Sequence, residues 1–216
     1  MAYRIVTIDG PAGAGKTTVS KLLAKELNCV RVDTGALYRG VAYEIRRQGI
    51  AWQDDKALED FLSHIDLRVI LEKEDLRLIS SGRDITLDIR TPEITMLASA
   101  VSARPAVRSA LLELQRRIAR QQDAVFEGRD MGTVVFPDAT VKFFLSADLA
   151  VRARRRFDEL PDSSKDLSRV AAEMRARDTR DSQRTQAPLK PAPDAILIDA
   201  SHLTVRQVVD EMLRHL

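Results

Sequence analysis

The sequence predicts an α/β fold in which a parallel sheet carries helices on both faces. Short runs rich in β-branched residues alternate with amphipathic helical segments along the chain, and a glycine-rich turn separates the first run from the first helix. Units of this kind join parallel strands through right-handed crossovers and bind their ligands beyond the carboxyl ends of the strands. We therefore expect the functional residues to follow strands.

The individual elements follow from the spacing of apolar residues. Strands that alternate with helices are expected at residues 3–9, 29–33, 124–127, 141–145 and 195–199. Helices are expected at residues 17–27, 35–48, 91–103, 105–122, 149–158, 168–181 and 204–216. Only four polar residues separate the apolar runs 67–71 and 76–79, which predicts an antiparallel hairpin, and residues 85–89 are expected to extend it. A polar loop is expected at residues 159–165, between two arginine-rich helices.

Length and composition narrow the class of protein. The chain has 216 residues, of which 44% are hydrophobic and 31% charged, and this suits one sizeable core with a small appended lobe. A net charge of +2 gives no case for a nucleic-acid or membrane partner, and no apolar run approaches the ~20 residues that cross a bilayer. The single cysteine, Cys29, suits a reducing compartment. We expect a cytoplasmic monomer.

The glycine-rich turn matches the complete phosphate-loop pattern G-x-x-x-x-G-K-[ST]. Backbone N–H groups of such a loop converge on phosphate oxygens, and the next helix adds the positive end of its dipole. Lys16 is expected to reach the β- and γ-phosphates and Thr17 to offer its hydroxyl to Mg²⁺. Asp33 is either an outer Mg²⁺ partner or a helix N-cap. The residues expected to hold ATP are Gly10, Pro11, Ala12, Gly13, Ala14, Gly15, Lys16, Thr17 and Thr18.

Further polar clusters follow the next strands. Residues 33–39 follow the second strand, and residues 127–133, with Gly128-Arg129-Asp130 at their centre, follow the third. Arginines gather again at 152–156 and at 177–184. Phosphoryl transfer needs such groups because guanidinium ions neutralise phosphate charge without losing a proton. The absence of a defined catalytic His or Asp pair favours a phosphate acceptor, whose attacking oxygen is already ionised. For Arg152–Arg156, a solvated helix face is an equally good interpretation.

These residues together resemble the bacterial cytidylate kinase family, whose members phosphorylate CMP and dCMP with ATP. The resemblance covers essentially the whole chain and is much more specific than the phosphate loop alone. It rests on Ile8-Asp9-Gly10-Pro11, on residues 33–39 and 128–137, on Arg177-Asp178-Thr179-Arg180-Asp181 with Arg184, and on Ala187-Pro188-Leu189. Two positions depart from the family pattern. Thr34 replaces a serine and Glu127 an aspartate, and the extra methyl group of Thr34 leaves the balance between CMP and dCMP open.

The resemblance implies the fold of a P-loop NTPase, specifically of a nucleoside monophosphate kinase. It is a three-layer α/β/α arrangement around a five-stranded parallel sheet, and the whole chain, 1–216, forms one kinase domain. The implied core covers residues 1–33, 104–147 and 185–216. The nucleoside-monophosphate lobe covers 34–103, with a small antiparallel insert at about 61–90, and the lid covers about 148–184.

The resemblance also implies roles for individual residues. The set that holds CMP is Thr34, Tyr38, Arg39, Ser99, Arg108, Arg129, Asp130, Arg177, Asp181 and Arg184. Arg39, Arg108 and Arg129 would hold the phosphate group. Ser99 and Arg108 would lie near cytosine. Asp130, Asp181 and Arg184 would address the sugar or order its contacts. Apart from the resemblance, the catalytic groups that we expect are Lys16, Arg129, Arg155 and Arg177, and the expected metal partners are Thr17 and Asp33.

Two other functions remain open. A kinase of the same fold acting on UMP, AMP or shikimate shares the phosphate loop. Only the enlarged lobe and the Tyr38-Arg39 and Gly128-Arg129-Asp130 clusters favour cytidylate over these acceptors. A switch or assembly ATPase would instead hydrolyse ATP without an acceptor and would need a surface for its partner. The sequence shows no segment suited to such a surface.

Overall fold

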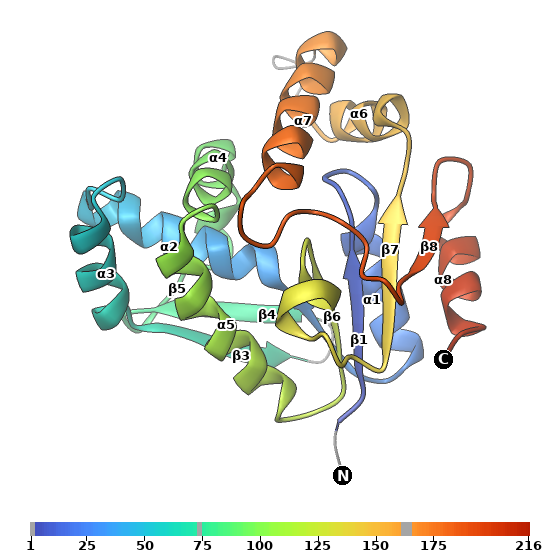
Figure 1. Ribbon diagram of the computed structural model, residues 1–216, viewed down its shortest axis with the longest axis horizontal. Coiled ribbons are helices and arrows are strands. Elements are labelled where there is room, and N and C mark those ends of the chain that lie inside the picture. The colour runs from blue at the N-terminus through green and yellow to red at the C-terminus, as the bar shows by residue number, and fades with distance from the viewer. Residues whose placement is uncertain (1–2, 73–74, 161–165) are drawn as a thin grey trace.

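The computed structural model describes residues 3–72, 75–160 and 166–216. A five-stranded sheet with the order β2-β6-β1-β7-β8 forms its centre (Figure 1). Every neighbouring pair of strands in this sheet is parallel. The strands are β1 (Ile5–Asp9), β2 (Val30–Asp33), β6 (Ala124–Gly128), β7 (Val141–Ser146) and β8 (Ile196–Asp199). The predicted α/β fold class is confirmed.

Successive side chains of β1 point to opposite faces of the sheet, and each face has its own apolar core. Val6 and Ile8 belong to one core with residues of α1 (Lys16–Glu26) and α8 (Val205–Leu213). Ile5 belongs to the other core, which is built with α2, α4 and α5. These three helices are α2 (Thr34–Gln48), α4 (Pro92–Val101) and α5 (Pro105–Ala119). The molecule therefore has three layers, with the sheet in the middle.

A second sheet of three antiparallel strands lies beside α2. Its strands are β3 (Leu67–Glu72), β4 (Asp75–Ser80) and β5 (Arg83–Asp84), in the order β3-β4-β5. The hairpin is as predicted, although its turn at residues 73–74 lies outside the described residues.

The prediction of a third strand at residues 85–89 is wrong, because this strand ends at Asp84. The Asp84 carboxylate accepts the N–H of Thr86 at 3.0 Å, a local turn that competes with the sheet ladder. A 3₁₀ turn, η1 (Asp88–Arg90), follows. Ile85 and Ile89 are still buried, but as core residues beneath the helices and not as members of a strand.

A further helix, α3 (Asp55–His64), was not predicted. Asp54 caps it by accepting the N–H of Ala57 at 2.8 Å. Only Leu58 and Phe61 are buried along its length, so its apolar pattern is too short to be recognised from sequence. It packs against α5, and Leu58 and Phe61 join the same core as α2, α4 and α5.

The arginine-rich helices α6 (Leu149–Asp158) and α7 (Leu167–Ser182) pack on each other beyond the carboxyl ends of the central strands (Figure 1). Their small core, made by Ala153, Val170 and Met174, also contacts Ala12 of the glycine-rich loop. Part of the polar loop expected between them, residues 161–165, lies outside the described residues. The bounds predicted for the lid and the acceptor lobe stay predictions. No helix in the described ranges is long and apolar enough to cross a lipid bilayer.

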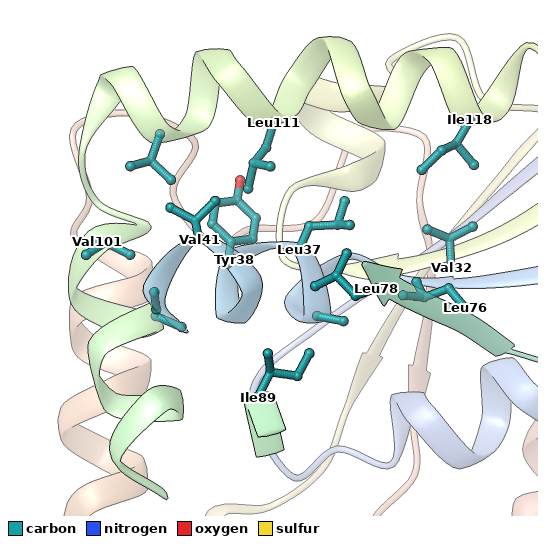
Figure 2. Close-up of a cluster of buried hydrophobic side chains, with 14 of the residues drawn as sticks. Val32, Leu37, Tyr38, Val41, Leu76, Leu78, Ile89, Val101, Leu111 and Ile118 are labelled. Atoms are coloured by element: carbon teal, nitrogen blue, oxygen red, sulfur yellow. The ribbon is translucent and has the colours of Figure 1, made fainter. Parts of the chain in front are cut away.

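Leu37 belongs to the larger core, together with Val32 of the sheet and Leu78 of the insert (Figure 2). Its side chain is fully buried. We expect Leu37→Ala to lower the free energy of unfolding by about 2–5 kcal/mol, because the lost methyl groups leave a cavity that the sheet prevents from closing. Urea denaturation measures this change. Leu87→Ala is the matched control, since Leu87 is 80% exposed and its loss should cost less than about 0.5 kcal/mol. Equal losses in the two variants would contradict the assignment of Leu37 to the core.

Candidate active site

The glycine-rich loop joins β1 to α1 and leaves the start of that helix open. Gly10 has a φ of 147°, and a Cβ atom built there would lie 2.0 Å from the carbonyl oxygen of Leu145, so no other residue fits. Gly15, with a φ of 96°, precedes α1 directly, and no side chain caps the first turn of this helix. Uncapped N–H groups and the helix dipole together attract an anion.

The Lys16 side chain is hydrogen-bonded within the loop, and its pKa is affected by an arginine outside the loop. Its Nζ donates to the carbonyl oxygens of Gly10 at 2.8 Å and Pro11 at 2.6 Å. Burial, and then the positive charge of Arg129, lower the pKa of Lys16 well below its usual value. Thr17 and Thr18 are exposed beside it, and the Thr17 hydroxyl donates to Glu127 Oε2 at 3.0 Å.

The acceptor of the Thr17 hydroxyl, Glu127, is itself bound to a second charged residue of the sheet. Glu127 is buried at the end of β6, and its Oε1 accepts a hydrogen bond from Arg31 Nη1 at 2.6 Å. Burial, and then repulsion from Asp33, raise the pKa of Glu127. The sequence prediction did not include Arg31 or Glu127 among the site residues. The available signal was a charged side chain within a run expected to be a buried strand.

Asp33 both caps a helix and pairs with an arginine. Its Oδ1 accepts the N–H of Ala36 at 3.3 Å, and its Oδ2 accepts from Arg39 Nη2 at 2.7 Å. Burial opposes ionisation here, but the guanidinium groups of Arg39 and Arg31 outweigh it and lower the pKa of Asp33. Asp33 is therefore the N-cap of α2, and its role as an outer Mg²⁺ partner stays a prediction. Thr34, next in the chain, is buried, and its hydroxyl donates to the Glu127 carbonyl oxygen at 2.7 Å.

Two ion pairs hold the residues that follow β6. Arg129 Nε donates to Asp181 Oδ2 at 3.2 Å, which links the strand end to α7. Asp130 is buried and accepts a hydrogen bond from Arg108 of α5. The Arg108 guanidinium in turn lies over the ring of Tyr38, 5.7 Å from its centroid. Burial raises the pKa of Tyr38 to about 12, so this ring stays neutral.

Several buried polar groups in this region have no hydrogen-bond partner among the described residues. They are Arg39 Nε, Arg177 Nε, Arg184 Nη2 and the hydroxyl of Ser99 on α4. Burial, and then Arg129, lower the pKa of Arg177 to about 10, and burial also lowers the pKa of Arg184. Unsatisfied buried donors and crowded positive charge are both costly. An anion with several acceptor oxygens would relieve both costs.

The arginines of α6 divide into two groups. Arg152 donates to the carbonyl oxygen of Ala12 at 3.1 Å and pairs with Asp178 of α7 at 2.7 Å, so it connects these two helices to the glycine-rich loop. Arg155 donates to the carbonyl oxygen of Ala200 at 2.7 Å, beside the same loop. Arg154 and Arg156 are exposed and pair with Asp158 and Glu159, close to them in the chain. The contacts described for Arg155 are therefore with the loop side of the site, and not with the arginines that follow β6.

Comparison with known proteins gives one consistent family. The family model described as cytidylate kinase matches residues 6–216. The protein named cytidylate kinase in Geobacter sp. (strain M21) is 47% identical over 212 residues, which cover 97% of this chain and 91% of that protein. Its namesake in Azotobacter vinelandii (strain DJ / ATCC BAA-1303) is 45% identical, over 97% of this chain and 93% of that one. Among solved structures, a shikimate kinase from Bacteroides thetaiotaomicron matches with a TM-score of 0.50 and 13% identity, over 98% of this chain and 97% of its own, which shows the fold alone.

Proposed function

The chain belongs to the cytidylate kinase family, and from that premise we propose that it transfers the γ-phosphoryl group of ATP to CMP or dCMP, giving ADP and CDP or dCDP. One observation supports this most strongly. Asp9 pairs with Gly128 in the parallel sheet, so the phosphate loop and Arg129 follow neighbouring strands at the same sheet edge. Burial together with the positive charges of Arg129 and Arg177 lowers the pKa of Lys16. A phosphoryl donor and a phosphate acceptor, both anionic, need such a shared site to overcome their repulsion. The expected role is in pyrimidine nucleotide metabolism.

On the donor side, the proposal assigns the β- and γ-phosphates to Lys16 and to backbone N–H groups of the loop at residues 10 and 12–18, with Pro11 lining the loop without an N–H group. Thr17 is the proposed Mg²⁺ ligand, with Asp33 as an outer partner. The described residues contain no group of three or more His, Cys, Asp or Glu side chains that could hold a metal ion. That fits Mg²⁺, which binds through one or two protein oxygens plus substrate phosphates. When bound, Mg²⁺ would neutralise charge on the phosphates.

On the acceptor side, the proposal assigns the CMP phosphate to Arg39, Arg108 and Arg129. The unpartnered Nε of Arg39 supports this assignment. Ser99 and Arg108 are proposed to lie near cytosine, and the free hydroxyl of Ser99 suits a hydrogen bond to the base. The proposed groups for the sugar and its surroundings are Asp130, Asp181 and Arg184. Thr34 and Tyr38 complete the set. The Thr34 hydroxyl already donates to the Glu127 carbonyl oxygen, so we propose that Thr34 holds the end of β6 in place.

The reaction follows from these charges as a direct in-line transfer. The attacking oxygen of CMP is already ionised, so no general base is needed. Lys16, Arg129 and Arg177 would stabilise the charge that spreads over the transferring group. Arg155 is the proposed lid contribution, since it lies against the phosphate loop. Closure of the lid and the acceptor lobe would exclude the water that otherwise hydrolyses ATP. We propose a monomer.

The proposal predicts which acceptors support turnover. Release of ADP from Mg·ATP is measured with CMP, dCMP, UMP, AMP and shikimate offered separately, and without acceptor. We expect fast release with CMP and dCMP, and little in the absence of an acceptor, because the acceptor arginines are built for a nucleoside monophosphate. The ratio of the CMP and dCMP rates reports the effect of the Thr34 methyl group. Release that is indifferent to the acceptor would instead identify a switch ATPase, and release with shikimate alone a shikimate kinase.

A further inference from the structure

We propose that Asp9 is a positioning residue whose carboxylate holds the Arg129-Asp130 segment of the acceptor site against the strand that leads into the phosphate loop. This inference rests on the proposed function, because it concerns the same site. Asp9 is the last residue of β1 and lies opposite Gly128 of β6 in the sheet. Gly10 of the loop follows it on one side of the site, and Arg129 follows Gly128 on the other. No other residue of β1 adjoins both segments.

The Asp9 carboxylate caps a helical turn that belongs to a different part of the chain. Its Oδ1 accepts the N–H of Met131 at 2.9 Å and its Oδ2 accepts the N–H of Gly132 at 2.8 Å. These donors open the π-helical turn η2 (Met131–Val135). Two N–H groups that this turn leaves unpaired thus end on one carboxylate from β1.

The residue in the N-cap position of η2 is Asp130, and it makes no side-chain cap. Aspartate is among the best N-cap residues, so Asp130 would ordinarily accept these N–H groups itself. Its carboxylate instead accepts a hydrogen bond from Arg108 of α5. Asp9 takes over the capping and leaves Asp130 available for the site. We infer that Asp130 and its neighbour Arg129 are held in position because Asp9 binds the N–H groups of the turn while Asp130 binds Arg108.

The negative charge of Asp9 is unfavourable in its buried position. Only 4% of the residue is exposed. The pKa of Asp9 is raised to about 6: burial is the largest cause and the charge of Asp130 adds to it, while the N–H groups of Gly132 and Met131 and the charge of Lys16 act in the opposite direction. Because the pKa is higher in the folded than in the unfolded chain, the charged form present at neutral pH works against folding. A buried charge that disfavours folding and caps a turn of the acceptor site is typical of a functional constraint.

Asp9→Asn tests this with the smallest change in shape. The amide keeps one acceptor oxygen but turns an NH₂ group toward the second N–H, so one cap bond is lost and Asp130 can rotate to replace it. We expect the KM for CMP to rise about ten-fold and kcat to fall about ten-fold, with the KM for Mg·ATP changed less than about three-fold. A merely structural role would lower the amount of active enzyme and leave the KM for CMP unchanged.

Thr7→Val is the matched control. Thr7 lies on the same strand, two residues before Asp9 and on the same face, and its buried hydroxyl has no hydrogen-bond partner among the described residues. We expect wild-type kinetics from this variant. In an Asp130→Asn background, Asp9→Asn should have little further effect on the KM for CMP, since the two changes act on one unit. An additive effect, or an unchanged KM in Asp9→Asn alone, would overturn the proposal.

A second readout separates this inference from the proposed function. Hydrogen exchange of the Met131 and Gly132 amides in the free protein does not depend on turnover. We expect faster exchange of at least one of them in Asp9→Asn and unchanged exchange in Thr7→Val, because the Asp9 carboxylate is their acceptor. If the wild-type protein failed to phosphorylate CMP, the proposed function would fall, and protection of these amides would still decide whether Asp9 positions the segment. Unchanged exchange in Asp9→Asn would count against Asp9.

Discussion

Replacing Arg129 with alanine is expected to lower kcat with CMP about a hundred-fold, equivalent to about 3 kcal/mol of transition-state stabilisation. Arg129 lies between two parts of the site. Its Nε pairs with Asp181 of α7, and its positive charge acts on Lys16 of the phosphate loop. Without Arg129, one guanidinium group that stabilises the charge developing on the transferring phosphoryl group would be lost. Steady-state ADP release measures kcat, and thermal unfolding reports whether the fold is retained.

Arg154→Ala is the control for this prediction. Arg154 also carries a guanidinium group, but it is exposed on α6 and pairs with Asp158 within the lid. Its removal should change kcat less than about two-fold, since exposed ion pairs contribute little. The fold should survive in the Arg129 variant as well, because Arg129 is partly exposed and belongs to no apolar core. Near-normal turnover of Arg129→Ala would remove this residue from the mechanism.

Lys16→Met is expected to reduce kcat/KM for Mg·ATP by about a thousand-fold, on the order of 4 kcal/mol. The ammonium group lies on the loop carbonyl oxygens, where the proposal places the β- and γ-phosphates. Stability should change little. The lowered pKa of Lys16 means that its positive charge is disfavoured in the folded chain, so its removal relieves repulsion from Arg129 and Arg177. This relief offsets the two hydrogen bonds that are lost. Kinetics with varied Mg·ATP and thermal unfolding together test both statements.

The same substitution at Lys25 isolates the effect of position. Lys25 lies in the last turn of α1 and is exposed, so Lys25→Met makes the same chemical change on the same helix, away from the loop. We expect it to keep the kinetics of the wild-type protein. Should both variants lose activity equally, the loss would come from the helix or from overall charge, and Lys16 would have no special role.

Features with local causes were predictable from the sequence. The strands and helices of the central layers follow from apolar spacing, and the phosphate loop follows from its glycines and Lys16 between a strand and a helix. Helix α3 was missed because it buries only Leu58 and Phe61, and residues 85–89 were misassigned because a turn at Asp84 overrides their apolar pattern. In both places the decisive factor was a contact or a side-chain hydrogen bond that spacing does not reveal.

By itself, the sequence determined the α/β class, the phosphate loop and the family to which the chain belongs. Only the tertiary structure decided which charged groups face one another. The strand order β2-β6-β1-β7-β8 places β1 directly beside β6, so Asp9 lies opposite Gly128 and caps the turn at Met131, although more than a hundred residues separate them in the chain. The Thr17 contact with Glu127 and the Arg129 pair with Asp181 depend on the same packing. Spacing along a chain records local periodicity, whereas these contacts depend on strand order and register, which are set by how the whole core packs.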